Sequence, residues 1–256
     1  MALSIRQADI LDLARSEGRV AVEDLARRFD VTVQTIRRDL TELSDAGLLD
    51  RVHGGAMLRT GVANIGYDER RRMNEAGKAA IAGAAAAAIP DNSSLILNIG
   101  TTTEAVARAL LGHRNLTVVT NNMNVANILA ANPSSEVVVA GGVLRRSDGG
   151  LVSELTTHVF EQFKVDIAVI GCSALDEEGD ILDFDLAEVR VSKAILRQAR
   201  RAFLVADASK LGRPAPARLA SLSEIDALFT DAPLPETLAE RCRAWDTDVV
   251  VAAPAL

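Results

Sequence analysis

The sequence predicts an α/β protein of two parts, a small N-terminal helical domain with a β-hairpin and a larger C-terminal domain built on a mostly parallel sheet. Two patterns predict this class. Three short helical segments and a glycine-centred hairpin fill the first sixty residues, and apolar strand-like runs alternate with helical segments from residue 78 onward. Such alternation is typical of a parallel sheet covered by helices on both faces. We place the domains at 1–58 and 78–256, joined by a linker at 59–77.

Composition limits the classes of protein that fit. Hydrophobic residues make up 48% of the 256 residues and aromatic residues 3%, so we expect an aliphatic core. The N-terminus lacks a charged segment followed by an apolar run, and no apolar stretch reaches the roughly 20 residues that span a bilayer. Cys172 and Cys242 have neither disulfide nor metal-site spacing. We therefore expect a cytoplasmic protein with no metal and no cofactor.

The formal net charge of −7 argues weakly against a nucleic-acid-binding protein, because such proteins usually display a basic face. Neither the first 60 residues nor the remainder is net basic. The arrangement of the charges is more informative here than their sum.

Three helices are predicted in the first domain. The first covers about 4–16, the second is VEDLARRF at 22–29, and the third follows a short turn with Thr32 as its N-cap. Apolar residues recur at helical spacing in each of them. The positions expected to face inward are Ile10, Leu13, Ala14, Val22, Leu25, Ala26, Phe29, Val33, Ile36, Leu40 and Leu43. Two helices joined by a tight turn after a first helix indicate a helix-turn-helix unit.

The third helix carries a polar outer face suited to DNA. Its hydroxyl, amide and guanidinium groups are those that read base edges and bind phosphates. With the N-cap included, the candidate DNA-binding residues of this helix are Thr32, Gln34, Thr35, Arg37, Arg38 and Thr41. Taken alone, this helix also fits a three-helix cap or dimerisation domain with a solvated face.

A hairpin pattern follows the third helix. In LLDRVHGGAML, two short extended runs flank a glycine turn, as in the wing of a winged helix. His53 and Gly54 lie at the predicted tip, where they are candidates for a DNA contact. In the linker, Arg70, Arg71 and Arg72 could contact DNA phosphate, pair with acids of the second domain, or lie in water.

The second domain alternates strand-like and helical patterns. The expected strands are LILNI, LTVVT, EVVVAGG, DIAVIG, AFLVAD, ALFTD and DVVVAA, and the clearest helices are KAAIAGAAAAAI, TEAVARALL, NVANILAA and AEVRVSKAILRQAR. In such sheets, ligands bind beyond the carboxyl ends of the strands.

Small, hydroxyl, amide and basic residues follow these strands. Glycine lets backbone N–H groups approach an anion, a helix N-terminus adds a favourable dipole, and a lysine supplies a positive charge. The residues concerned are Gly100, Thr101, Thr102, Thr103, Asn121, Asn122, Gly141, Gly142, Asp148, Gly149 and Lys210. Together they predict a sugar-phosphate pocket. It is neither a Walker loop nor a dinucleotide site, since GK[ST] and GxGxxG are both absent.

A family resemblance rests on segments from both domains. TVQTIRRDLTEL and GLLDRVHGGA resemble the DNA-binding half of the DeoR family of bacterial transcriptional regulators. IGTTTEAVA, VTNNMNVANIL, AGGVLRRSDGGLV, DFDLAEVR and DASKLGR resemble its effector domain and, within the family, a repressor that responds to glycerol 3-phosphate. That domain shares its fold with ribose-5-phosphate isomerase and glucosamine-6-phosphate deaminase.

The resemblance implies a role for each candidate residue. Gly100 to Thr103 and Lys210 would hold the phosphate of the effector. The residues that would face the rest of the ligand are Asn121, Asn122, Asp148, Asp185 and Glu188. The partners implied are operator DNA and a phosphorylated small molecule, with glycerol 3-phosphate as the favoured effector. Because a helix-turn-helix monomer covers little DNA, we also expect a homo-oligomer, either dimer or tetramer.

The sequence favours a sensor over an enzyme. An isomerase of this fold needs a carboxylate base beside the substrate, and the related enzymes carry an acidic loop of the type DGAD. Here the loop reads SDGGLVSE, so Asp148 remains but Leu151 stands at the next acidic position. Two alternatives stay open. One is a DeoR-type regulator that senses another sugar phosphate, such as a tagatose, fructose or deoxyribose phosphate. The other is a sugar-phosphate isomerase with an appended DNA-binding domain.

Overall fold

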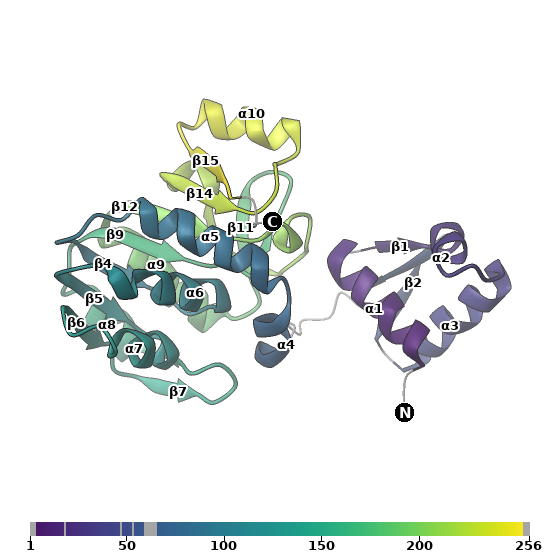
Figure 1. Ribbon diagram of the computed structural model, residues 1–256, viewed down its shortest axis with the longest axis horizontal. Coiled ribbons are helices and arrows are strands. Elements are labelled where there is room, and N and C mark those ends of the chain that lie inside the picture. Colours follow the sequence, from purple (N-terminus) through teal and green to yellow (C-terminus); the bar gives the residue numbers. More distant parts are fainter. Residues whose placement is uncertain (1–3, 18, 47, 53, 59–65, 253–256) are drawn as a thin grey trace. The chain divides into compact units, whose positions relative to one another are not determined.

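The computed structural model describes residues 4–17, 19–46, 48–52, 54–58 and 66–252. The chain divides into two compact units, Met1–Ala63 and Asn64–Leu256 (Figure 1). In the described parts, no helix is long and apolar enough to cross a membrane.

The N-terminal unit is a winged helix. Its three helices enclose a core in which Ile10, Ile36, Leu40 and Leu43 are completely buried. The predicted helices and hairpin are confirmed, and a short strand before α2 adds to the hairpin in the order β1-β3-β2. The elements are α1 (Ile5–Glu17), β1 (Arg19–Ala21), α2 (Val22–Arg28), α3 (Val33–Asp45), β2 (Leu49–Val52) and β3 (Gly55–Leu58).

A seven-stranded sheet forms the centre of the second unit. Its order is β15-β14-β12-β9-β4-β5-β6, and all its recorded pairings are parallel. Each of the seven apolar runs predicted from the sequence forms one of its strands. They are β4 (Ser94–Leu97), β5 (Leu116–Thr120), β6 (Ser135–Val139), β9 (Val165–Ile170), β12 (Ala199–Val205), β14 (Ala227–Thr230) and β15 (Asp248–Val251).

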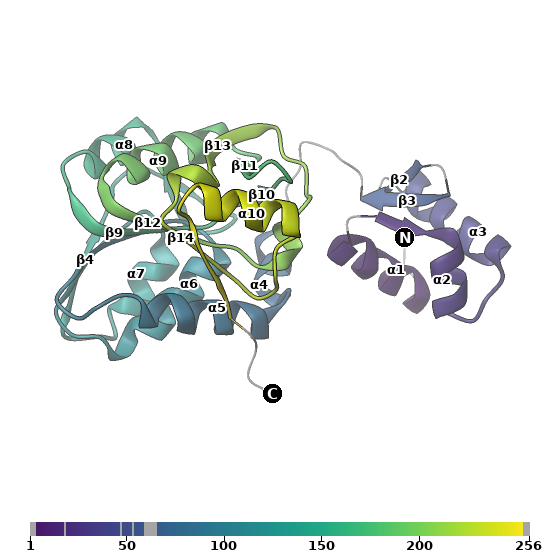
Figure 2. The same ribbon diagram turned by 90° about the horizontal axis from the view of Figure 1, so that it is seen from above.

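Helices cover both faces of this sheet. Helices α5, α6 and α7 pack on one face and α8, α9 and α10 on the other, and Figure 2 shows α5–α7 and α8–α9 as separate layers. In β4, Leu95 and Leu97 belong to one core cluster and Ile96 to the opposite one, which explains the unbroken apolar run. The helices are α4 (Tyr67–Arg72), α5 (Glu75–Ala87), α6 (Thr101–Ala109), α7 (Met123–Leu129), α8 (Glu154–Phe160), α9 (Leu186–Arg197) and α10 (Glu236–Ala244).

Smaller elements surround the sheet. A hairpin of β7 (Val143–Arg145) and β8 (Gly150–Val152) and a sheet of β10 (Ala174–Leu175), β11 (Asp180–Asp183) and β13 (Ala217–Ser221) were not predicted. The 3-10 helices are η1 (Leu110–Gly112), η2 (Ala208–Lys210) and η3 (Leu222–Glu224).

Two helix boundaries differ from the prediction by three residues. The helix predicted at 78–89 begins at Glu75, since Asn74 lies in the left-handed region (φ 47°) and its side chain accepts a hydrogen bond from the amide of Gly77. The helix predicted to reach residue 200 ends at Arg197, because Ala199 already pairs with Val165 in the sheet.

Replacing two glycines by alanine should change the free energy of unfolding in opposite directions. Gly142 has φ 142°, and a Cβ built there would lie 2.1 Å from Thr156 Oγ1, so Gly142→Ala should destabilise the fold by about 1–3 kcal/mol. Gly83 lies within α5 with nothing near its Cβ position, so Gly83→Ala should stabilise it by about 0.5–1 kcal/mol. Urea unfolding measures both changes. A Gly142→Ala variant as stable as the wild type would contradict this account of Gly142.

Candidate functional site

The third helix of the first unit separates an apolar face from a polar one. Its N-terminus is capped as predicted, with Thr32 Oγ1 accepting a hydrogen bond from the amide of Thr35 at 3.2 Å. Ile36, Leu40 and Leu43 face the core. The exposed residues on the opposite side include Gln34, Arg37, Arg38 and Thr41.

Two acids of α3, Asp39 and Glu42, have partners within the first unit. Asp39 is buried and accepts a hydrogen bond from Arg6 Nε at 2.6 Å. Hydrogen bonds from Arg38 and Gln7 lower the pKa of Glu42. Within the described part of the chain, the guanidinium of Arg37 has neither a hydrogen-bond nor an ion-pair partner. Positive charge therefore remains on this face although the domain as a whole is slightly acidic.

An arginine that the sequence analysis did not single out connects the wing to this helix. Arg51, on β2, donates from Nη1 to the carbonyl of Arg37 at 3.1 Å and to Thr41 Oγ1 at 2.8 Å. Thr41 in turn donates to the carbonyl of Arg37 at 2.8 Å. The hydroxyl of Thr41 is thus engaged within the protein. Gly54 has φ 78° in the hairpin turn, and the predicted contact residue His53 lies outside the described residues.

The loop after β4 exposes the start of a helix without a side-chain cap. Gly100 is the N-cap of α6, with φ 147° and ψ 151°, a conformation that favours glycine. Thr103 donates from Oγ1 to the carbonyls of Asn98 and Gly100 at 2.8 and 2.7 Å, so its hydroxyl shapes the loop. The first amides of a helix have no intrahelical acceptor, and they carry the positive end of the helix dipole. Such a loop is suited to bind an anion.

Three cationic side chains, Lys210, Arg213 and Arg70, lie near one another beyond the carboxyl end of β12. Burial lowers the pKa of Lys210, Asp207 opposes that effect, and the charges of Arg213 and Arg70 lower it further. Burial and the charge of Arg70 also lower the pKa of Arg213. Among the described residues, the Lys210 ammonium has no hydrogen-bond or ion-pair partner. An anion bound here would reduce the repulsion among these cations.

The end of β9 lies between the loop and these cations. A Cβ built on Gly171 would lie 3.8 Å from the carbonyl oxygen of Ile99 and 4.0 Å from that of Val205. Strands β4 and β12 flank β9, so their ends are about 10 Å apart. The Gly100 loop and the Lys210 loop therefore border one small area at the carboxyl edge of the sheet.

The paired asparagines lie after β5 and are both fully buried. Asn122 caps α7 by accepting from the amides of Asn124 and Val125. Asn121 Nδ2 donates to the carbonyl of Leu151 at 3.1 Å, while its Oδ1 has no hydrogen-bond partner in the described structure. A buried carbonyl oxygen without a donor is a candidate acceptor for a ligand hydroxyl.

A polar network joins these asparagines to α4. Tyr67 donates from its hydroxyl to Glu104 Oε2 at 2.9 Å, and Asn124 Nδ2 donates to Glu104 Oε1 and to the Tyr67 oxygen at 3.0 Å each. Burial, and the nearby charge of Glu104, raise the pKa of Tyr67 to about 12. Sequence reasoning missed this network. The available signals were an acid in the first turn after the GTTT loop and the only tyrosine of the chain.

One guanidinium holds the three acids that we expected to face the ligand. Arg145, on β7, contacts Asp148 Oδ1 at 2.9 Å, Asp185 Oδ2 at 2.5 Å and Glu188 Oε2 at 2.6 Å. Burial opposes its charge, but Asp148 and Glu188 outweigh that effect and raise the pKa of Arg145. Burial and the charge of Asp183 raise the pKa of Glu188 to about 7, although Arg145 counteracts them.

Other predicted residues have structural contacts. Gly141 and Gly142 pack against α8, where Thr156 Oγ1 donates to the carbonyl of Gly141 at 2.7 Å. Gly149 has φ 75° in the β7–β8 turn, and its carbonyl accepts from the amide of Met123 at 2.9 Å. Arg70, from the predicted linker, pairs with Asp148 at 3.8 Å and so lies at the pocket.

The comparisons with known proteins match both units. A DeoR-like helix-turn-helix domain matches residues 6–61, and the DeoR C terminal sensor domain matches residues 73–232. A glycerol-3-phosphate regulon repressor of Escherichia coli (strain K12) is 44% identical over 90% of this chain and 91% of its own length. Its counterpart from Haemophilus influenzae is 42% identical over 98% of both chains.

Solved structures with a similar fold include ribose 5-phosphate isomerases. The ribose 5-phosphate isomerase of Methanocaldococcus jannaschii matches with a TM-score of 0.40 and 16% identity, over 54% of this chain and 55% of that one. The matches of both units to the DeoR domain families confirm the resemblance seen in the sequence. The chain belongs to the DeoR family of transcriptional regulators.

Proposed function

We propose that this protein is a cytoplasmic transcriptional repressor whose affinity for operator DNA is controlled by a small phosphorylated metabolite. The observation that carries the proposal is the uncapped N-terminus of α6 at Gly100, at the same sheet edge as the half-buried cation Lys210. Residues 1–58 would bind DNA and 78–256 the effector, with 59–77 joining them. The relatives from E. coli and H. influenzae make glycerol 3-phosphate the first effector to test.

The phosphate of the effector would occupy the area bordered by the Gly100 and Lys210 loops. Backbone amides at the start of α6 would donate to its oxygens, and Lys210 would supply a compact positive charge. Arg213 and Arg70 add positive charge around Lys210. The predicted residues Thr101 and Thr102 are nearly buried in the first turn of α6, which favours a role for their amides.

The polar remainder of the effector would lie toward the ends of β5 and β7. Asn121 offers a buried acceptor there, and Asp148 and Glu188 lie beside Arg145. A glycerol moiety presents two hydroxyls that could use such groups. Other sugar phosphates, such as tagatose, fructose or deoxyribose phosphates, present the same chemistry and remain the alternative.

The carboxylates at this edge favour a sensor over an isomerase. A base must be free to take a proton from the substrate. Asp148 and Glu188 both accept hydrogen bonds from Arg145, so the guanidinium already occupies an oxygen of each carboxylate. A coupled turnover assay with ribose 5-phosphate would reveal residual isomerase activity, and we expect none.

Helix α4 offers a physical route from the effector to the DNA-binding domain. It lies within the segment 59–77 that joins the two domains, and two of its side chains contact the pocket network. Tyr67 binds Glu104, three residues after Thr101, and Arg70 pairs with Asp148. An effector changes DNA affinity only by binding the DNA-competent and incompetent states unequally. If α4 has different positions in the two states, an effector that contacts its side chains would bind those states unequally.

Operator binding should depend on the third helix. Arg37→Ala and Arg38→Ala are each expected to weaken it about tenfold or more, because one good guanidinium contact contributes ~1–3 kcal/mol. Arg114→Ala, an exposed arginine of the other unit that pairs with Asp91, is the matched control. Fluorescence anisotropy with an operator fragment measures the affinities. Unchanged binding in both helix variants would remove the recognition-helix assignment.

The effector should stabilise the folded protein. At about 100 times its dissociation constant, a ligand that binds only the native state adds roughly 2.7 kcal/mol to the free energy of unfolding. Thermal unfolding with glycerol 3-phosphate and a panel of sugar phosphates measures this effect. A shift with another sugar phosphate alone would change the effector. No shift with any of them would refute the pocket.

Lys210→Ala should separate effector binding from DNA binding. We expect operator affinity to stay within about twofold, while release of DNA by the effector is lost, because the charge facing the phosphate is removed. Arg200→Ala removes an exposed cation at the opposite end of the same strand and should respond normally. A normal response in the Lys210 variant would contradict the phosphate site.

A further inference from the structure

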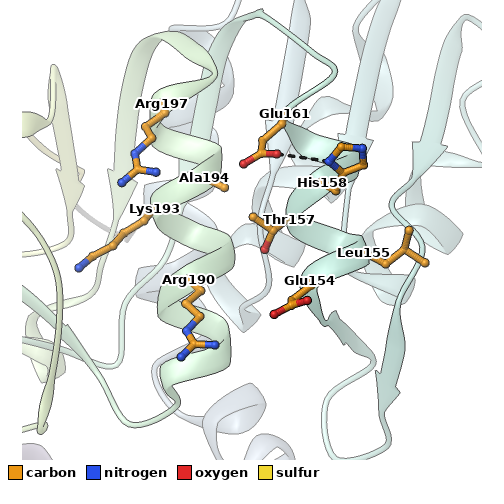
Figure 3. A pocket seen from close by; sticks show the side chains of 9 residues that line it. All are labelled: Glu154, Leu155, Thr157, His158, Glu161, Arg190, Lys193, Ala194 and Arg197. Carbon is orange, nitrogen blue, oxygen red and sulfur yellow. Dashed lines mark ion pairs between the residues drawn. The ribbon is translucent and has the colours of Figure 1, made fainter.

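A groove of about 680 Å³ lies between α8 and α9, and none of the predicted effector residues lines it. Its two walls carry opposite charge. Figure 3 shows Glu154 and Glu161 on the α8 side and Arg190, Lys193 and Arg197 on α9. All five side chains are exposed.

These charges are not paired across the groove. Glu161 contacts His158 on its own helix at 3.4 Å. Among the described residues, Arg190, Lys193 and Arg197 form no ion pair with any acid. The charged side chains of both walls are therefore free to form ion pairs with a second protein surface of complementary charge.

The spacing of the charges is the same on both helices. Glu154 and Glu161 are seven residues apart, as are Arg190 and Arg197, so each pair spans about 10 Å along one helix face. The two helices run in the same direction, because each leads into one of the neighbouring parallel strands β9 and β12. Glu154 therefore lies level with Arg190, and Glu161 with Arg197 (Figure 3).

This arrangement is complementary to itself. A half-turn about an axis that lies in this face, parallel to the two helices and between them, would place α8 of a second copy over α9 with the same direction. Glu154 of that copy would then face Arg190, and Glu161 would face Arg197. The same contacts repeat on the other side of the axis, as an interface with two-fold symmetry requires.

Exposed apolar side chains lie next to the groove. Leu155 on α8 is 57% exposed, and Val143 and Leu144 on the β7 hairpin are 67% and 51% exposed. A Cβ built on Gly141, two residues before Val143, would lie 3.4 Å from Leu155, so the start of the β7 hairpin lies beside Leu155. Exposed ion pairs alone contribute little, whereas buried apolar area drives association. The charges would select the partner and its orientation.

We propose that two copies of this chain associate through their α8–α9 faces, with the acidic helix of each copy on the basic helix of the other. The interface lies in the sensor domain and needs neither DNA nor effector. It would bring two DNA-binding domains together on one operator.

A charge-swap experiment tests the interface in the full-length protein. One variant carries Glu154→Lys and Glu161→Lys, and the other carries Arg190→Glu and Arg197→Glu. Each alone should self-associate at least about tenfold more weakly than the wild type, because like charges then face one another. Mixed in equal amounts, the two variants should associate again, since every contact between them is complementary. Sedimentation velocity without DNA or effector measures all three samples.

The mixture also excludes a trivial explanation. Repulsion between α8 and α9 within one chain would weaken each variant, but mixing would not repair it. Thermal unfolding confirms that both variants are folded, and Arg114→Glu, elsewhere on the surface, should associate like the wild type. A monomeric wild type, variants that associate normally, or folded variants that fail to associate when mixed would each overturn the proposal.

Discussion

The site in the second unit depends on one constraint, the parallel direction of all seven strands of its sheet. Their carboxyl ends meet at a single edge, and helices cover both faces, so the polar groups that follow the strands collect there. The Gly100 loop, the paired asparagines and Lys210 come from three different strands, yet the pairing order places all of them at this edge. The aliphatic core holds the strands in this sheet, and the sheet in turn places the polar loops beside one another.

Arg145 resolves an electrostatic conflict at that edge. Three carboxylates close to a phosphate would repel it, but Asp148, Asp185 and Glu188 share the guanidinium of Arg145. The cations around Lys210 are consequently not all neutralised by these acids. In the first unit, Arg6 acts comparably on the buried Asp39 of α3. A protein with a net charge of −7 can thus present local positive charge to anions.

Sequence patterns predicted the elements with strong apolar periodicity and missed the rest for physical reasons. The seven strands of the large sheet have apolar runs, and the helices of the winged helix have apolar stripes, that the sequence analysis could assign. Strands β7, β8 and β10 have two or three residues each and depend on tertiary pairing, and α8 contains two threonines within seven residues. The strand-end rule found Lys210 and the asparagines, but Arg213 and Tyr67 reach the site through long side chains that no local pattern reveals.

The central claim is that the phosphate site and the DNA-binding helix are coupled. Thermodynamic linkage requires that coupling to be reciprocal. The most direct measurement is therefore a calorimetric titration of glycerol 3-phosphate into the protein, performed once alone and once with saturating operator DNA. For a repressor released by its effector, the effector should bind several-fold more weakly when operator is present. Equal affinities in the two titrations would contradict the account, even if both ligands bind tightly.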